Sequence, residues 1–169
     1  SVAGLTGVGD TQGLPYLAPG FIDLQVNGYD GVDYSSGTVT AEEMRRLVET
    51  LAASGVTRHL PTIITNSRER IPASLESMQE IIAGDGLLRT AIPGFHVEGP
   101  FISAEDGPRG AHDRKYVRPP DPEEYRSWQK AAGGRIRIVT LAPELPGAID
   151  LIREISADGA LPAIGHSAA

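Results

Sequence analysis

The 169-residue sequence contains no cysteine, which excludes a disulfide framework and any metal site built on thiolates. No apolar run approaches the roughly 20 residues that a membrane-spanning helix needs. No basic segment followed by an apolar one marks a signal peptide, so we expect a cytoplasmic protein. The metal ligands that remain are four histidines and the carboxylates.

The chain also lacks an excess of positive charge. Fifteen basic and 22 acidic side chains give a formal net charge of −7, which argues against binding to nucleic acid. A phosphorylated small substrate is not excluded, because a few arginines or a backbone nest would suffice to hold it. Hydrophobic residues make up 40% of the chain, enough for one folded domain with a real core.

Short apolar runs alternate with amphipathic segments along most of the chain. Thr40 followed by Glu43 predicts a capping box at the start of the first helix. The segment after the first strand, rich in glycine, and the polar segment 99–120 are expected to be loops, the second lying over one face. No helix or strand is predicted for residues 1–15. The predicted strands are 20–26, 57–64, 91–98, 135–141 and 161–165, and the predicted helices are 40–55, 66–84, 121–131 and 146–157.

Near-continuous apolar strands separated by helices predict a buried parallel sheet of the α/β class. Two architectures fit this pattern. An open doubly wound sheet would be complete with five strands, whereas a (β/α)8 barrel typically needs about 250 residues. The pattern alone therefore slightly favours the open sheet.

Polar side chains follow three of the predicted strands. Glu98 ends the third strand and His166 ends the fifth, while Gln25 and Asn27 share a face at the end of the first. Because the carboxyl ends of parallel strands gather on one side of the sheet, we expect these side chains to meet there. A carboxylate and an imidazole are ligands for a hydrolytic metal. His96 shares the face of Glu98 and could orient a neighbour or simply be a satisfied core histidine.

Three further residues have two readings each. His59 lies in an apolar strand and, like His96, could orient a neighbour or be a core histidine; it is interpreted as structural. His112, in the long loop beside Gly110, could approach a substrate closely or be exposed to solvent. Glu144 could lie at the strand ends or pair with the N-terminus of a helix.

Several motifs occur in the order seen in one known family. The chain resembles the N-acetylglucosamine-6-phosphate deacetylases of the amidohydrolase superfamily over about residues 19–167. Residues 1–18 show little resemblance and are interpreted as a remnant of a small flanking β domain. The motifs are Pro19-Gly-Phe-Ile-Asp-Leu-Gln-Val-Asn-Gly28, Leu60-Pro-Thr62, His96-Val-Glu-Gly-Pro-Phe-Ile-Ser103, Gly110-Ala-His-Asp113, Thr140-Leu-Ala-Pro-Glu144 and Gly165-His-Ser167.

The resemblance implies a (β/α)8 TIM barrel, of which residues 19–169 would be the N-terminal portion with about the first five β/α units. This overturns the preference for an open sheet. It also implies one divalent metal ion, zinc in the first place, with iron, manganese or cobalt as alternatives. By the same resemblance Glu98 and His166 bind the metal, and Ala111 and His112 bind the substrate. Gln25, Asn27 and His96 would lie around the metal and its water.

The implied reaction removes the acetyl group of N-acetylglucosamine 6-phosphate, giving glucosamine 6-phosphate and acetate. In the family the third metal-binding histidine ends strand six and a general-base aspartate ends strand eight. Both would lie beyond residue 169, so we expect no catalytic base in this chain and impaired activity of the chain alone. We expect a longer enzyme that is a homodimer. The alternatives are hydrolysis of another cyclic amide or N-acyl group and a non-catalytic fragment that binds sugar phosphates.

Overall fold

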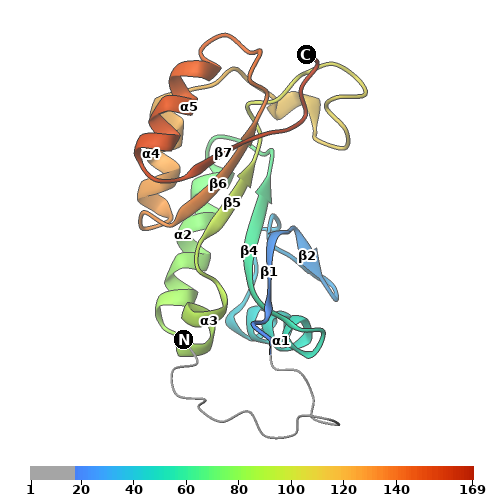
Figure 1. Cartoon of the computed structure of the whole chain (residues 1–169), viewed down its shortest axis with the longest axis vertical. Helices are drawn as coiled ribbons and strands as arrows, with labels where there is room; N and C mark the ends of the chain where they lie inside the picture. The colour runs from blue at the N-terminus through green and yellow to red at the C-terminus, as the bar shows by residue number, and fades with distance from the viewer. Residues whose placement is uncertain (1–17) are drawn as a thin grey trace, which may run out of the picture.

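Five parallel strands form one curved sheet in which each strand lies beside the one that precedes it in the chain (Figure 1). The computed structural model describes residues 18–169. The flanking-domain remnant predicted for residues 1–18 falls almost wholly outside the described residues. The strands of this sheet are β1 (Phe21–Val26), β4 (Val56–Ile64), β5 (Phe95–Glu98), β6 (Ile136–Leu141) and β7 (Leu161–Ile164).

The strand order β1-β4-β5-β6-β7 runs in one direction without a reversal. A doubly wound sheet reverses its strand order at the switch point where ligands bind. A barrel instead adds each new strand beside the last one. The doubly wound sheet that the sequence pattern favoured is therefore wrong, and the architecture is a singly wound, curved parallel α/β sheet.

Helices connect consecutive strands and supply one side of the core. The first begins at the predicted capping box: the Thr40 hydroxyl accepts from the Glu43 N–H at 3.2 Å, and the Glu43 carboxylate accepts from the Thr40 N–H at 2.8 Å. No helix between residues 18 and 169 is both long and apolar enough to cross a membrane. The helices are α1 (Ala41–Ala53), α2 (Arg70–Ala83), α3 (Gly86–Ala91), α4 (Pro122–Ala131) and α5 (Ala148–Ala157), with a 3₁₀ turn at Arg114–Tyr116.

Two local predictions differ from the structure. The strand expected over 91–98 begins only at Phe95, because a short helix, α3, ends at Ala91 and residues 92–94 connect the two elements. The Asp85 carboxylate starts that helix by accepting from the N–H groups of Leu87 and Leu88. The glycine-rich segment expected as a loop after β1 contains a small antiparallel hairpin, β2 (Gly28–Tyr29) and β3 (Val32–Asp33).

Alternate side chains of the strands point to opposite faces of the sheet. On β5, Phe95 and Val97 are fully buried in the core beneath the helices. Trp128 of α4 is also in that core and stacks on Phe101 with ring centroids 5.0 Å apart. His96 and Glu98 point the other way, into the concave side of the sheet. The fold thus directs the predicted polar residues away from the core.

Candidate metal centre

Glu98 and His166 meet at the carboxyl ends of their strands, as the sequence predicts. Glu98 is the last residue of β5, and His166 follows the end of β7. The Glu98 Oε1 atom lies 3.1 Å from His166 Nε2. Two ligand atoms on a tetrahedral metal with bonds of about 2.0–2.1 Å are separated by about 3.3 Å. The pair therefore has close to the spacing that a bound metal requires.

The other ring nitrogen of His166 defines its tautomer. Nδ1 lies 2.9 Å from the Pro108 carbonyl, which can only accept a hydrogen bond, so Nδ1 carries the proton. A protonated His166 then donates Nε2–H to the Glu98 carboxylate, whereas the neutral ring presents the lone pair of Nε2 to it. Two acceptors at this distance need a proton or a cation between them. Backbone carbonyls orient metal-binding histidines in this way in many proteins.

The backbone of His166 adopts an uncommon conformation. Its φ is 52°, in the left-handed region that non-glycine residues seldom occupy. Such strain costs roughly 1–3 kcal/mol and persists only where the surroundings impose it. Here the Ser103 N–H donates to the His166 carbonyl at 2.9 Å, while Pro108 holds the ring. The position of the imidazole is thus built into the fold.

The second carboxylate oxygen of Glu98 accepts a hydrogen bond of 3.0 Å from Gln25 Nε2 on β1. Burial alone would raise the pKa of Glu98. The hydrogen bond with His166, the charges of His112 and His166, and the Gln25 amide outweigh burial, so the pKa of Glu98 is lowered. The carboxylate is therefore ionised at neutral pH, as metal binding requires.

His112 completes a cluster of three potential ligands. The ligand atoms of Glu98, His112 and His166 all lie within 4.8 Å of one another. The two imidazoles meet edge to face with centroids 4.3 Å apart, and His112 Nδ1 lies 2.7 Å from the Thr65 hydroxyl. Burial, followed by the charge of His166, lowers the pKa of His112. His112 is buried, so the solvent-exposed reading of this loop residue is wrong.

His96, by contrast, makes its hydrogen bonds away from Glu98. Its Nδ1 donates to the Leu24 carbonyl at 3.1 Å, so Nε2 accepts from the Thr140 hydroxyl at 2.8 Å. These bonds link β1, β5 and β6, and burial lowers the pKa of His96. The ring therefore ties three strands together on the concave side of the sheet.

The remaining predicted site residues lie at the edge of the cluster or outside it. Asn27 and Ala111 are exposed. His59 is buried beside Tyr34, whose hydroxyl lies 2.8 Å from His59 Nε2, in line with the structural reading. Glu144 accepts hydrogen bonds from the Ser167 hydroxyl at 2.8 Å and the Ala168 N–H at 2.7 Å, so it holds the segment that comes after His166.

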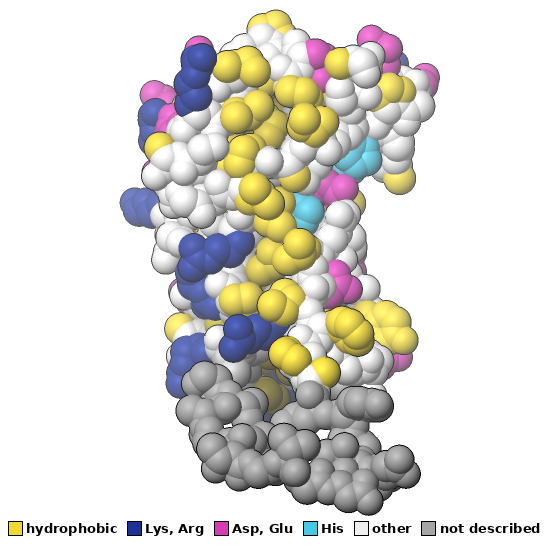
Figure 2. Space-filling model, in the orientation of Figure 1, with side chains coloured by type: hydrophobic (Ala, Val, Ile, Leu, Met, Phe, Trp, Pro, Cys, Tyr) yellow, Lys and Arg dark blue, Asp and Glu magenta, His cyan; other side chains and the backbone are white. Residues whose placement is uncertain are grey.

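A cavity of about 370 Å³ opens in front of Glu98 and His166 on the concave face. Apolar side chains from β6 and β7 form much of its wall, including Ile138, Leu161 and Ile164. Figure 2 shows histidine and acidic side chains beside a strip of hydrophobic side chains on this face. The cluster therefore borders an open, largely apolar concave face.

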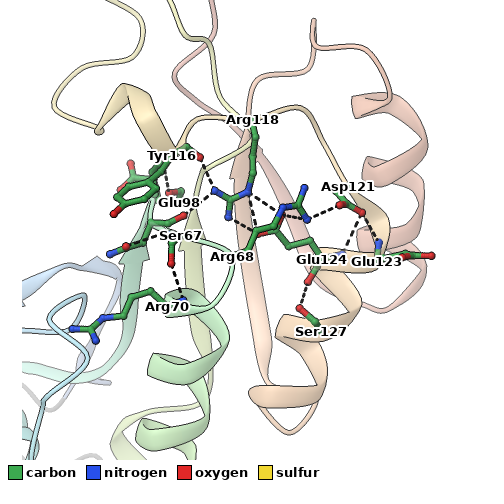
Figure 3. Close-up of polar contacts among 12 residues, drawn as sticks. Ser67, Arg68, Arg70, Glu98, Tyr116, Arg118, Asp121, Glu123, Glu124 and Ser127 are labelled. Carbon is green, nitrogen blue, oxygen red and sulfur yellow. Dashed lines mark hydrogen bonds and ion pairs between the residues drawn. The ribbon is translucent and has the colours of Figure 1, made fainter.

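The long loop that carries His112 is anchored at its far end by Arg118. Its Nε donates to the Glu124 carboxylate at 2.9 Å, and its Nη1 donates to the Asn66 carbonyl at 2.8 Å (Figure 3). The Glu124 side chain is only 3% exposed and also pairs with Arg68 at 3.0 Å. The sequence does not reveal this network, because its members come from separate segments and form no motif.

Fold and cluster together define an α/β protein with a candidate metal centre at the carboxyl ends of its parallel strands. A comparison with protein-family models agrees: the model described as the amidohydrolase family matches residues 16–166. The chain belongs to the amidohydrolase family.

Individual relatives are more specific. The chain is 34% identical over 153 residues to N-acetylglucosamine-6-phosphate deacetylase of Bacillus subtilis, covering 89% of this chain and 38% of that protein. It is 36% identical over 156 residues to the human protein of the same name, covering 90% of this chain and 37% of that protein. The chain thus spans less than two fifths of the length of these curated relatives.

The solved structures to which this chain is similar carry the same name as these relatives. The structure is similar to that of a variant N-acetyl-D-glucosamine-6-phosphate deacetylase from Mycobacterium smegmatis in complex with N-acetyl-D-glucosamine-6-phosphate, with a TM-score of 0.79 and 32% identity over 89% of this chain and 37% of that one. The Thermotoga maritima deacetylase gives a TM-score of 0.73 at 28% identity, over 88% of this chain and 37% of that one.

Proposed function

We propose that the whole protein hydrolyses the acetamide of N-acetylglucosamine 6-phosphate, giving glucosamine 6-phosphate and acetate. The observation that carries the proposal is the contact of Glu98 with both His166 and Gln25 at the strand ends. A neutral amide at the end of the first strand, in the Gln25-Val-Asn27 motif, accords with a single metal ion. The names of the relatives supply the substrate.

The donor set fits a divalent metal, since one carboxylate and one or two imidazoles suit zinc, iron, manganese or cobalt. When bound, the metal supplies a Lewis acid that polarises the acetyl carbonyl and makes water reactive at neutral pH. Glu98 and His166 would hold it, with Gln25 orienting the carboxylate. His112 and the exposed backbone at Ala111 would position the acetamide. We assign the proton transfer to an aspartate outside this chain.

We further propose that residues 19–169 form about the first five β/α units of a (β/α)8 barrel. Supporting this, the edge strand β7 leaves Leu161 58% and Ile164 78% exposed. Beside it an apolar groove of about 300 Å³ includes Ile149 and Ile152 of α5. A further strand and helix would cover these side chains. The homodimer and the cytoplasmic location stay predictions.

The decisive experiment measures metal content and deacetylation together. In the whole protein we expect one metal ion per chain and release of acetate from N-acetylglucosamine 6-phosphate. Glu98→Gln and His166→Ala should each lose the metal and the activity while keeping the circular dichroism of the fold. Near-normal turnover by either metal-free variant would refute the proposal. Binding of the sugar phosphate without metal or turnover would favour the non-catalytic alternative.

A further inference from the structure

The loop segment 103–112 surrounds His166 on several sides. The Pro108 carbonyl accepts a hydrogen bond from the ring of His166, and the Ser103 N–H donates one to the His166 carbonyl. It also comes so close at Gly110 that a β-carbon there would lie 3.4 Å from His166 Cε1. The orientation of the proposed metal ligand therefore depends on the shape of this segment.

Two glycines give the backbone of this segment an uncommon conformation. Gly107 and Gly110 adopt positive φ values of 96° and 58°, a region that glycine enters and leaves at little cost. Three backbone hydrogen bonds close the turn: the Arg109 N–H donates to the Glu105 carbonyl at 3.0 Å, the Gly110 N–H to the Gly107 carbonyl at 3.0 Å, and the His112 N–H to the Arg109 carbonyl at 3.4 Å. None of these bonds includes Pro108, so its position depends on further contacts.

The Arg109 side chain supplies such contacts. Its Nη1 donates to the His112 carbonyl at 2.6 Å, and its Nη2 pairs with the Asp106 carboxylate. The side chain is only 19% exposed, and its Nε is buried without a hydrogen-bond partner in the described part of the chain. The guanidinium thus joins Asp106 to His112. Pro108, which accepts the hydrogen bond from His166, comes directly before Arg109 in the chain.

We propose that Arg109 is a positioning residue that fixes the 103–112 segment and, through the Pro108 carbonyl, the tautomer and orientation of His166. The inference rests on the proposed function of His166 as a metal ligand. Arginine suits the task because its planar fork reaches two acceptors in different directions, whereas a lysine ammonium is a single point charge. Arg109 itself does not touch the proposed metal or the substrate.

Titration of the metal-free whole protein with Co²⁺, followed by the visible absorption of the bound ion, tests the proposal. We expect Arg109→Gln to weaken Co²⁺ binding about tenfold, as loss of a group that orients a metal ligand typically does. Arg109→Lys should weaken it less. The matched control is Arg153→Gln, which removes a similar arginine–aspartate pair, with Asp150 at 2.7 Å, on the exposed side of α5. This control should bind Co²⁺ like the wild type.

A second variant covers the case in which Arg109→Gln does not fold. Asp106 is 80% exposed, so Asp106→Asn removes one partner of Arg109 without disturbing the core, and it should weaken Co²⁺ binding to a smaller extent. Unchanged Co²⁺ affinity in both Arg109→Gln and Asp106→Asn would overturn the positioning role alone. If the wild type bound no Co²⁺ that depends on Glu98, the proposed metal site itself would be wrong.

Discussion

The Glu98 carboxylate at the end of β5 and the His166 imidazole after β7 lie 3.1 Å apart, although β6 separates their strands in the sheet. The second ring nitrogen of His166 donates to the Pro108 carbonyl. When the ring is neutral, its Nε2 lone pair is directed at the carboxylate, and these two acceptors need a proton or a cation between them. The geometry of the pair therefore favours a bound cation. The long loop therefore shapes the proposed metal site through a backbone carbonyl that orients His166.

Gly110→Ala should disturb the metal site through a direct contact. The new β-carbon would lie 3.4 Å from His166 Cε1, tighter than most contacts of this kind, and it would sit on a backbone with φ of 58°. We expect Co²⁺ or Zn²⁺ affinity to fall at least about tenfold. Gly107→Ala is the control: its φ is 96°, so it shares the strain, but nothing lies within 4 Å. Equal losses in both variants would point to strain alone.

His112→Ala separates a substrate-binding role from a metal-binding one. The resemblance assigns His112 to the substrate, although its ligand atom lies within 4.8 Å of those of Glu98 and His166. We expect a raised KM or a turnover lowered by at least about tenfold, with the metal content unchanged. Metal analysis of the purified variant is the check. Loss of the metal together with the activity would make His112 the third ligand instead.

Arg118→Gln should destabilise the protein strongly. Arg118 is 14% exposed, and its loss leaves the buried Glu124 carboxylate with only the more exposed Arg68 as a partner. Removing one partner of a buried ion pair costs about 3 kcal/mol. Urea unfolding followed by circular dichroism measures the change. Arg153→Gln, at an exposed pair, should change the midpoint little, and a similar small change for Arg118 would contradict the anchoring role.

His59 should make the stability depend on pH. Burial lowers its pKa from 6.5 to about 4. Between these values the unfolded state binds a proton that the folded state does not, so stability is fully present above pH 6.5 and is lost as the pH falls toward 4. The full effect of this residue is about 3 kcal/mol. Urea midpoints at pH 7.5 and pH 5 should therefore differ less in His59→Gln than in the wild type. An identical difference would exclude His59 as the cause.

Much of the fold was predictable from local patterns. The apolar runs that became β4, β6 and β7 were found close to their bounds, and the capping box at Thr40 and Glu43 was confirmed. The short helix α3 was missed, because Gly84 was interpreted only as the end of α2. Asp85 immediately after it starts the next helix. A glycine indicates where an element stops, but it does not indicate which type of element comes next.

The site was predictable in its first members and not in its surroundings. Glu98 and His166 could be paired because both end strands, and the carboxyl ends of parallel strands share one side of the sheet. Thr65, Pro108 and Arg109 carried no signal. Their contacts with His112 and His166 join distant segments or use backbone atoms. Such contacts cannot be inferred from the residue types alone.

The sequence by itself determined the class of the sheet, the residues that end its strands and the resemblance to the deacetylases, because hydrophobic period and motif order are properties of the chain alone. Only the tertiary structure decided the strand order and the tautomer of His166. It also showed that His96 ties strands together while His112 approaches Glu98. Those outcomes depend on which atoms lie within about 3 Å of one another, and such distances arise only when separate segments pack together.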